Sequence, residues 1–447
     1  MPFRCTIALV IRFALLVLGS ALGSPAAAAD AKASDCRIGT YRLSDGSDVD
    51  VSTVDSDHLR WRRDDGATGK LTRINGERWS STIGWTSRPD GKRISFDCGR
   101  HSIDFDGVSG ARLSFDVHET RFRGSGVELQ GRLVLPEGTS KVPIVVLVHG
   151  AEHDSARDLY SLQRQFPARG IGAFVYDKRG TGASGGHYTQ DYLTLADDAI
   201  AAAREARRLA GFRAGRIGYQ AGSQGGWVAP LAARIEPVDF LIVGFGLAVS
   251  PLEEDREAIA LNMIQRGFGP SVVAKAMSVA DATAAVLLSG FREGFDKVDA
   301  VKKQYSRYPW FHYIHGNFSF VILEQTPAQL REVGPTLLPG IPLQYDPMPV
   351  LQNLRVPQLW ILGGADIDAP SAETARRLKA LAAKGMPLTT VVFPQAEHGM
   401  YEFEIAPDGT RISTRQPQGY FQMMCDFIRN GEIGRRYGSA RIYRPAS

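Results

Sequence analysis

Three residue types that together cleave acyl bonds occur along this sequence in the order serine, aspartate, histidine. Ser223 lies in the stretch AGSQGG, among small and flexible residues. A serine hydroxyl is a poor nucleophile unless a histidine accepts its proton and a carboxylate orients that histidine. Asp366 in GGADIDAP and His398 in AEHGM supply both groups, each directly after an apolar run. We therefore expect Ser223, Asp366 and His398 to form a catalytic triad.

The residues around Ser223 fit a sharp turn between a strand and a helix. The run before the serine is typical of a buried strand and WVAPLAARI after it is typical of a helix, which is the context of a nucleophile elbow. Close packing at such a turn requires small residues two positions before and after the serine, and Ala221 and Gly225 occupy these positions. Because alanine stands in place of the usual glycine, a glycine-rich surface turn is the alternative interpretation. Asp368 is the alternative acid, although Asp366 lies nearer the end of its strand.

A serine triad also needs two preorganised N–H donors for the oxyanion that forms on the substrate. The backbone amide of Gln224, directly after the nucleophile, is one expected donor. The other is expected in the loop VLVHGAEHD, where Gly150 lets the backbone approach and the amide of Ala151 is best placed. His149 in this loop is expected to be structural rather than catalytic.

The elements that must position these residues alternate between strand and helix patterns from about residue 113 onward. Continuous apolar runs such as VPIVVLVHG, IGAFVYD and VPQLWILGG indicate strands buried on both faces, and TLADDAIAAAREARRL indicates a helix between strands. This alternation predicts an α/β fold with a doubly wound, mostly parallel sheet. We assign its first part to 113–249 and its second part to 350–447.

Residues 250–349 interrupt the alternation with helical sequence and are expected to form a cap over the carboxyl edge of the sheet. The densest aromatic cluster of this insertion is YPWFHYIHG. Trp310, Phe311 and Tyr313 in this cluster are predicted to line an acyl pocket. Packing inside the cap itself is the equally weighted alternative.

The N-terminal residues have a different composition from the rest of the chain. Residues 1–29 combine Arg4 and Arg12 with a short apolar stretch and a small-residue pattern ending at Ala29, which predicts a cleaved secretory signal. The apolar stretch is shorter than the roughly 20 residues that span a bilayer. We therefore expect an exported protein, periplasmic or extracellular, without a stable membrane anchor.

Residues 30–112 contain short alternating runs separated by Asp-Gly and Pro-Asp-Gly turns, which predicts a small antiparallel β module. Cys36 and Cys98 bracket most of the module, and export to an oxidising compartment predicts that they form a disulfide. Cys425 lies in an expected helix and is interpreted as a small buried hydrophobe. The tryptophans of the module are expected in its core, with an exposed polymer-binding face as the alternative; they are Trp61, Trp79 and Trp85.

Composition restricts the possible partners. The formal net charge is +4, part of which leaves with the leader, and no block of five or more like charges is present, so nucleic acid is not expected as a partner. The nine histidines include no H-E-x-x-H pattern, and His312 and His315 are expected to belong to the aromatic cluster rather than to a metal site. We expect a small-molecule ester as substrate and neither a metal nor another cofactor. The sequence leaves the oligomeric state open.

Together these motifs resemble the α/β-hydrolase superfamily, and within it a branch of bacterial secreted serine esterases. The matching stretches are HGAEHD, YDKRGTGASGG, AGSQGGWVAP, YDPMPVLQNLRVP, GGADIDAP and AEHGM, and the resemblance covers about residues 113–430. It implies hydrolysis of carboxylic esters through an acyl-enzyme intermediate. It also implies that Asp177 and Arg179 brace the loop beside the oxyanion hole.

Other functions occur on the same fold. A serine peptidase or an acyl-CoA thioesterase would use the same triad, although peptidases with an N-terminal propeller need a far longer region than 30–112. A non-catalytic envelope-binding protein with a vestigial site is a third alternative. The presence of all three triad residues argues against it.

Overall fold

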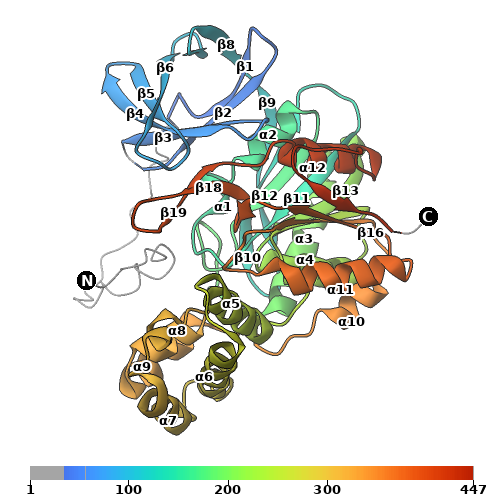
Figure 1. The fold of residues 1–447 in the computed structure, drawn as a ribbon. Helices are drawn as coiled ribbons and strands as arrows, with labels where there is room; N and C mark the ends of the chain where they lie inside the picture. The colour runs from blue at the N-terminus through green and yellow to red at the C-terminus, as the bar shows by residue number, and fades with distance from the viewer. Residues whose placement is uncertain (1–34, 56, 446–447) are drawn as a thin grey trace, which may run out of the picture. The chain divides into compact units, whose positions relative to one another are not determined.

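The computed structural model describes residues 35–55 and 57–445, so the expected signal peptide at 1–29 lies outside the described residues. Contacts divide the chain into two compact units (Figure 1). One unit comprises the N-terminal part up to Leu113 together with Glu402–Arg415. The other comprises Ser114–Tyr401 and the chain from Gln416 onward.

The first unit contains a closed barrel of eight strands. Each strand pairs antiparallel with its neighbour in the chain, and β1 closes on β8 with Tyr41 opposite Arg112. The alternating runs form strands because the Asp-Gly turns between them reverse the chain tightly. The strands are β1 (Gly39–Leu43), β2 (Asp48–Thr53), β3 (His58–Arg63), β4 (Thr68–Asn75), β5 (Arg78–Thr82), β6 (Pro89–Asp97), β7 (Ser102–Phe105) and β8 (Val108–Arg112).

An aromatic core fills the barrel. Trp61 and Trp79 are buried, and the indole N–H of Trp61 donates to Ser81 Oγ at 2.8 Å. Trp85 is exposed instead, and the guanidinium carbon of Arg60 lies 3.7 Å from the centroid of its ring. Two of the three tryptophans therefore belong to the barrel core, and the third is exposed and stacks on the buried Arg60.

A hairpin from the far end of the chain packs with the barrel strands. It is formed by β18 (Tyr401–Ile405) and β19 (Arg411–Arg415), and its residues were expected within the second part of the sheet at 350–447. The amide of Trp85 donates to the carbonyl of Ser413 at 2.8 Å. Gly84 permits this approach, because a Cβ at this position would lie 2.4 Å from the carbonyl oxygen of Thr414.

The second unit is built on a nine-stranded sheet in the order β20, β16, β15, β14, β13, β11, β12, β10, β9. The inner pairs are parallel, and β9, β10 and β20 add antiparallel edges. This confirms the predicted α/β class with a mostly parallel sheet. The strands are β9 (Phe115–Arg123), β10 (Glu128–Pro136), β11 (Val142–Val148), β12 (Gly172–Tyr176), β13 (Ala214–Gly222), β14 (Phe240–Gly244), β15 (Gln358–Gly363), β16 (Leu388–Phe393) and β20 (Arg441–Tyr443). The short β17 (Ala396–Glu397) follows β16 in the chain and is not part of this sheet.

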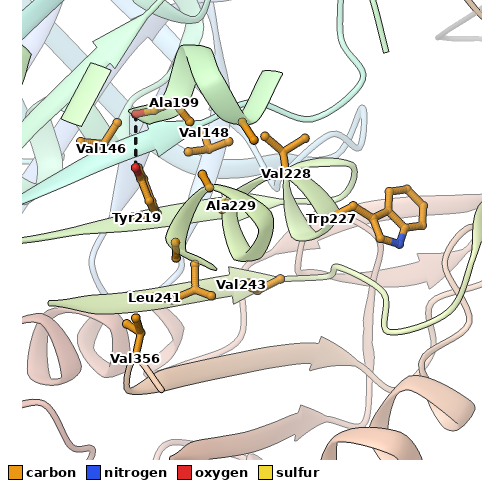
Figure 2. Packing of buried hydrophobic residues seen from close by; sticks show 14 of the residues in the cluster. Val146, Val148, Ala199, Tyr219, Trp227, Val228, Ala229, Leu241, Val243 and Val356 are labelled. Carbon is orange, nitrogen blue, oxygen red and sulfur yellow. Dashed lines mark hydrogen bonds between the residues drawn. The ribbon is translucent and has the colours of Figure 1, made fainter. Parts of the chain in front are cut away.

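Helices cover both faces of this sheet, which makes it doubly wound and explains why its inner strands are continuously apolar. Figure 2 shows one covered face, where Val146 and Leu241 of the sheet pack with Val228 of α4. On the opposite face, Phe166 of α2 packs against Phe421 of α12 with ring centroids 5.3 Å apart. The helices are α1 (Ala156–Leu159), α2 (Leu162–Ala168), α3 (Tyr192–Ala210), the 3₁₀ helix η1 (Gly211–Arg213), α4 (Gly225–Ile235), α10 (Met348–Asn353), α11 (Ser371–Ala383) and α12 (Tyr420–Asn430).

The insertion between β14 and β15 is helical. Its elements before α10 are α5 (Pro251–Gln265), α6 (Pro270–Leu288), α7 (Phe295–Tyr305), the 3₁₀ helix η2 (Pro309–Tyr313), α8 (Ser319–Glu324) and α9 (Pro327–Leu337). Among the described residues, α6 is the one helix whose length and hydropathy alone would suit a membrane span. Its buried face packs within the insertion, where Ala276, Val279 and Ala280 meet Ile259 of α5.

Cys36 and Cys98 form the predicted disulfide across a separation of 62 residues, whereas Cys425 is buried in α12. Replacing both bridged cysteines with serine should lower the free energy of unfolding of the barrel by about 2–4 kcal/mol, because the crosslink restricts the unfolded chain. Calorimetry of the wild type and of the Cys36→Ser/Cys98→Ser variant measures this difference. Identical melting of the two proteins would contradict the expectation.

Candidate active site

Ser223 occupies a strained turn between β13 and α4. Its φ is +52°, in the left-handed region that non-glycine residues rarely adopt. Two hydrogen bonds hold the turn: the Ser223 amide donates to the carbonyl of Gly244 at 3.2 Å, and the Gly226 amide donates to the carbonyl of Ser223 at 2.8 Å. The serine hydroxyl is thereby presented at the carboxyl end of the sheet, as a nucleophile elbow requires.

The small residues around Ser223 are explained by the contacts that larger ones would make. A Cβ on Gly225 would lie 2.7 Å from the carbonyl oxygen of His149 and 3.1 Å from the Cβ of Ala221. Because Gly225 lacks a Cβ, the methyl group of Ala221 fits in this space. The departure from the usual glycine at that position therefore leaves the geometry of the turn intact.

The structure brings together the serine, histidine and aspartate predicted from sequence. His398 Nε2 lies 3.0 Å from Ser223 Oγ, and His398 Nδ1 lies 3.0 Å from Asp366 Oδ2. Asp366 is buried, and its other oxygen accepts hydrogen bonds from the amides of Asp368 at 3.0 Å and Ala369 at 2.8 Å. Asp368 therefore supports Asp366 through its backbone amide.

Several groups set the charge state of His398. Burial disfavours the imidazolium, but the charge of Asp366 and its hydrogen bond, aided by Asp368 and Glu254, outweigh burial and raise the pKa of His398 to about 9. Phe245 packs edge-on against the imidazole, with ring centroids 5.0 Å apart. These contacts hold the ring in place and favour its protonated form, which is the form a general base reaches after taking a proton.

Two buried acids of α5 belong to the same region and were not predicted from sequence. Glu254 is 8% exposed, and burial together with nearby Asp255 and Asp366 raises its pKa well above the usual range. Asp255 accepts hydrogen bonds from the amides of Phe318 at 2.7 Å and Ser319 at 3.1 Å, and burial raises its pKa as well. In the sequence, Glu254 and Asp255 belong to an acidic cluster at the start of an insertion helix. Acidic residues in the first turn of a helix are usually solvated, so the cluster does not indicate burial.

The loop after β11 lies beside Ser223. A Cβ added to Gly150 would be 3.5 Å from the Cβ of Ser223. Among the described residues, no acceptor is found for the amides of Ala151 and Gln224, so both N–H groups are available for an oxyanion. His149 is buried, its Nε2 contacts the carbonyl of Tyr176, and burial lowers its pKa to about 4, which suits the expected structural role.

Two residues that sequence did not single out hold this loop. Lys178 Nζ donates to the carbonyl of Gly150 at 2.8 Å, and the hydroxyl of Tyr188 donates to the carbonyl of Ala151 at 2.7 Å. The motif YDKRGTGASGG and the residues after it carry both, but a lysine in a loop is usually a solvated surface residue. Only its burial in the structure distinguishes it.

The two residues that the resemblance marked as braces act differently. Asp177 accepts hydrogen bonds from Ser155 Oγ at 2.7 Å and from the amide of Arg157 at 3.2 Å, so it supports the end of the loop. Arg179 instead forms two 2.7 Å hydrogen bonds with Asp198 of α3. Asp177 therefore braces the loop, whereas Arg179 joins the turn after β12 to α3.

Two of the three predicted pocket aromatics, Trp310 and Phe311, lie in the core of the insertion. Trp310 and Phe311 are buried with Ile259 and Met263 of α5. Tyr313 is 38% exposed, and the guanidinium carbon of Arg266 lies 4.3 Å from its ring centroid. These contacts correspond to the packing alternative. Among the described residues, no group of three or more His, Cys, Asp or Glu side chains could hold a metal ion.

Comparison with known proteins finds solved structures that match this chain at low identity. No protein-family model matches the chain, and no curated protein sequence matches it. The acylaminoacyl peptidase of Pyrococcus horikoshii is 15% identical with a TM-score of 0.43, and the match covers 87% of this chain and 57% of the peptidase. An esterase of Pyrococcus furiosus is 15% identical with a TM-score of 0.40, and the match covers 64% of this chain and 84% of the esterase. The strand order, the parallel core and the serine turn after β13 define an α/β-hydrolase fold.

Replacing Asp366 with asparagine should lower kcat/KM for an ester by about 10⁴, because His398 loses the acceptor that fixes its tautomer. In the wild type, kcat/KM should rise with pH toward about 9, since the neutral imidazole is the base. The apparent pKa should fall in Asp366→Asn, because the charge that raises it is gone. Asp368→Asn is the control, and a larger loss in that variant would contradict the assignment.

Replacing Trp310 with alanine should lower the free energy of unfolding by about 3–5 kcal/mol, because it leaves a cavity in the core of the insertion. Thermal unfolding measures this loss. The relative rates on esters of different acyl chain length should stay as in the wild type. A changed chain-length preference with unchanged stability would instead place Trp310 in the acyl pocket.

Proposed function

We propose that this chain is a serine hydrolase that cleaves carboxylic esters of small molecules. The observation that carries the proposal is the arrangement of Ser223, His398 and Asp366, joined by two 3.0 Å contacts on a serine with a φ of +52°. A glycine-rich surface turn would explain the serine alone. It would not explain a buried aspartate and a histidine aligned behind it.

Acylation follows from this geometry. Ser223 Oγ attacks the ester carbonyl carbon while His398 Nε2 takes the hydroxyl proton, and Asp366 stabilises the resulting imidazolium. The carbonyl oxygen becomes an oxyanion and accepts hydrogen bonds from the amides of Ala151 and Gln224. When the tetrahedral intermediate collapses, the C–O bond to the alcohol breaks and His398 gives its proton to that oxygen.

Deacylation repeats these steps with water as the nucleophile. His398 takes a proton from water as its oxygen attacks the acyl carbon of the ester formed with Ser223. The second tetrahedral intermediate uses the same two amides. Its collapse breaks the bond between the acyl carbon and Ser223 Oγ, and His398 gives its proton to that oxygen. The products are the carboxylic acid and the regenerated serine, and no cofactor is needed.

The proposal includes export and an ester substrate. The disulfide between Cys36 and Cys98 supports an oxidising compartment, and residues 1–29 have the composition of a secretory leader. A serine peptidase or an acyl-CoA thioesterase is the alternative with the same triad. Matched p-nitrophenyl esters, acyl-CoA thioesters and aminoacyl anilides separate the three, and faster turnover of the esters is the expected result.

Replacing Ser223 with alanine should abolish covalent labelling by a fluorophosphonate and lower ester hydrolysis by about 10⁶, while the melting temperature is kept or rises. The labelled peptide, identified by mass spectrometry of the wild type, should contain Ser223. Label on another residue, or turnover retained in Ser223→Ala, would refute the proposed nucleophile. An unlabelled, inactive wild type would support a vestigial site.

A further inference from the structure

Lys178 is a buried cation beside the proposed oxyanion hole, and the mechanism above does not use it. It lies two residues after the end of β12 and is 2% exposed, which is rare for a lysine. Its Nζ donates to the carbonyl of Gly150 at 2.8 Å and lies 4.4 Å from the ring centroid of Tyr188. Burial lowers the pKa of Lys178 to about 8 and the charge of Glu152 opposes this, so the ammonium form predominates at neutral pH.

The carbonyl that Lys178 binds belongs to the same peptide group as the proposed oxyanion donor. The C=O of Gly150 and the N–H of Ala151 share one plane and, in a trans peptide, point in opposite directions. Fixing the carbonyl on the ammonium therefore fixes the direction of the N–H. Gly150 abuts the nucleophile, because a Cβ at this position would lie 3.5 Å from the Cβ of Ser223.

A charge on the carbonyl also changes the strength of the N–H as a donor. Hydrogen bonds to a charged group are stronger than neutral ones, and bonds in a chain polarise one another in a medium of low dielectric constant. An ammonium on the oxygen of Gly150 draws electron density through the amide and makes the hydrogen of Ala151 more positive. The hydrogen bond from such a donor is strengthened most when its acceptor carries a full negative charge.

We propose that Lys178 is a positioning residue of the oxyanion hole, which orients and polarises the Gly150–Ala151 peptide so that Ala151 N–H stabilises the transition-state oxyanion. This inference rests on the proposed function. The neighbouring contacts agree with it, because Tyr188 holds the next carbonyl, that of Ala151, at 2.7 Å. Glu152 supplies the compensating charge, and Tyr160 donates a hydrogen bond to it.

Lys178→Met tests the proposal, because methionine keeps much of the apolar stem and removes the ammonium. With a p-nitrophenyl ester, kcat should fall about 10²-fold, the usual cost of one oxyanion donor, while KM stays near the wild-type value. The affinity for a trifluoromethyl ketone, which forms a tetrahedral oxyanion adduct with the serine, should fall by a similar factor. Lys178→Gln, which keeps a neutral donor, should lie between the two proteins in both measurements.

Arg213→Met is the matched control, since Arg213 is also buried and its guanidinium donates to the carbonyl of Pro136 at 2.5 Å, outside the site. It should lower the melting temperature without changing kcat or the affinity for the ketone. Lys178 variants that behave like this control, or that lose kcat without losing affinity for the ketone, overturn the proposal. If Lys178→Met does not fold, Lys178→Gln against the wild type decides by the same two measurements.

Failure of this inference is distinguishable from failure of the proposed function. A wild type that neither hydrolyses esters nor reacts with a fluorophosphonate refutes the proposed function, and with it the inference that rests on it. A wild type that does both, beside a Lys178→Met variant with unchanged kcat and unchanged affinity for the ketone, refutes the role of Lys178 alone.

Discussion

The close approach of three backbone segments at the end of β13 is the constraint on which the rest of the site depends. Gly225 at the start of α4 lies so near the end of β11 that a Cβ would be 2.7 Å from the carbonyl oxygen of His149. Ser223 lies in this turn at a φ of +52°, and Gly150, the residue after His149, lies beside it. The turn that carries Ser223 and the loop after β11 are thus positioned by the same packing contact. A larger residue at Gly225 would therefore push the turn of Ser223 and the loop after β11 apart.

The features predicted correctly from sequence are those that local chemistry determines. Continuous apolar runs identify strands buried on both faces, and the order of Ser223, Asp366 and His398 after three such runs is sufficient to bring them to one edge of a parallel sheet. The disulfide was predicted from two cysteines around a β module and from the expectation of export to an oxidising compartment. Each of these inferences needs only the residues of one segment and the topology that connects it.

The features that were missed depend on partners far away in the sequence. The hairpin of β18 and β19 packs with the barrel through contacts such as Arg88 with Glu404, which are 316 residues apart, and nothing in its alternating sequence identifies that partner. Sequence alone did not distinguish packing of Trp310 and Phe311 in a hydrophobic core from lining of a substrate pocket, because both are built from aromatic clusters of the same composition. Sequence alone does not reveal that Lys178 and Glu254 are buried, because their burial also depends on partners far away in the sequence.

The buried charges of the site have opposite signs on the two sides of the reacting serine. Lys178 lies behind the peptide of the oxyanion loop, and Asp366 lies behind His398. In the proposed acylation the proton of Ser223 passes to His398, on the side of Asp366, while negative charge collects on the substrate oxygen, on the side of Lys178. Glu152 compensates Lys178, and the charges that would face the transition state are already held in place by the fold. Preorganised charges of this kind need no rearrangement at the moment of reaction, which is why fixed groups of a protein stabilise a transition state more than mobile water would.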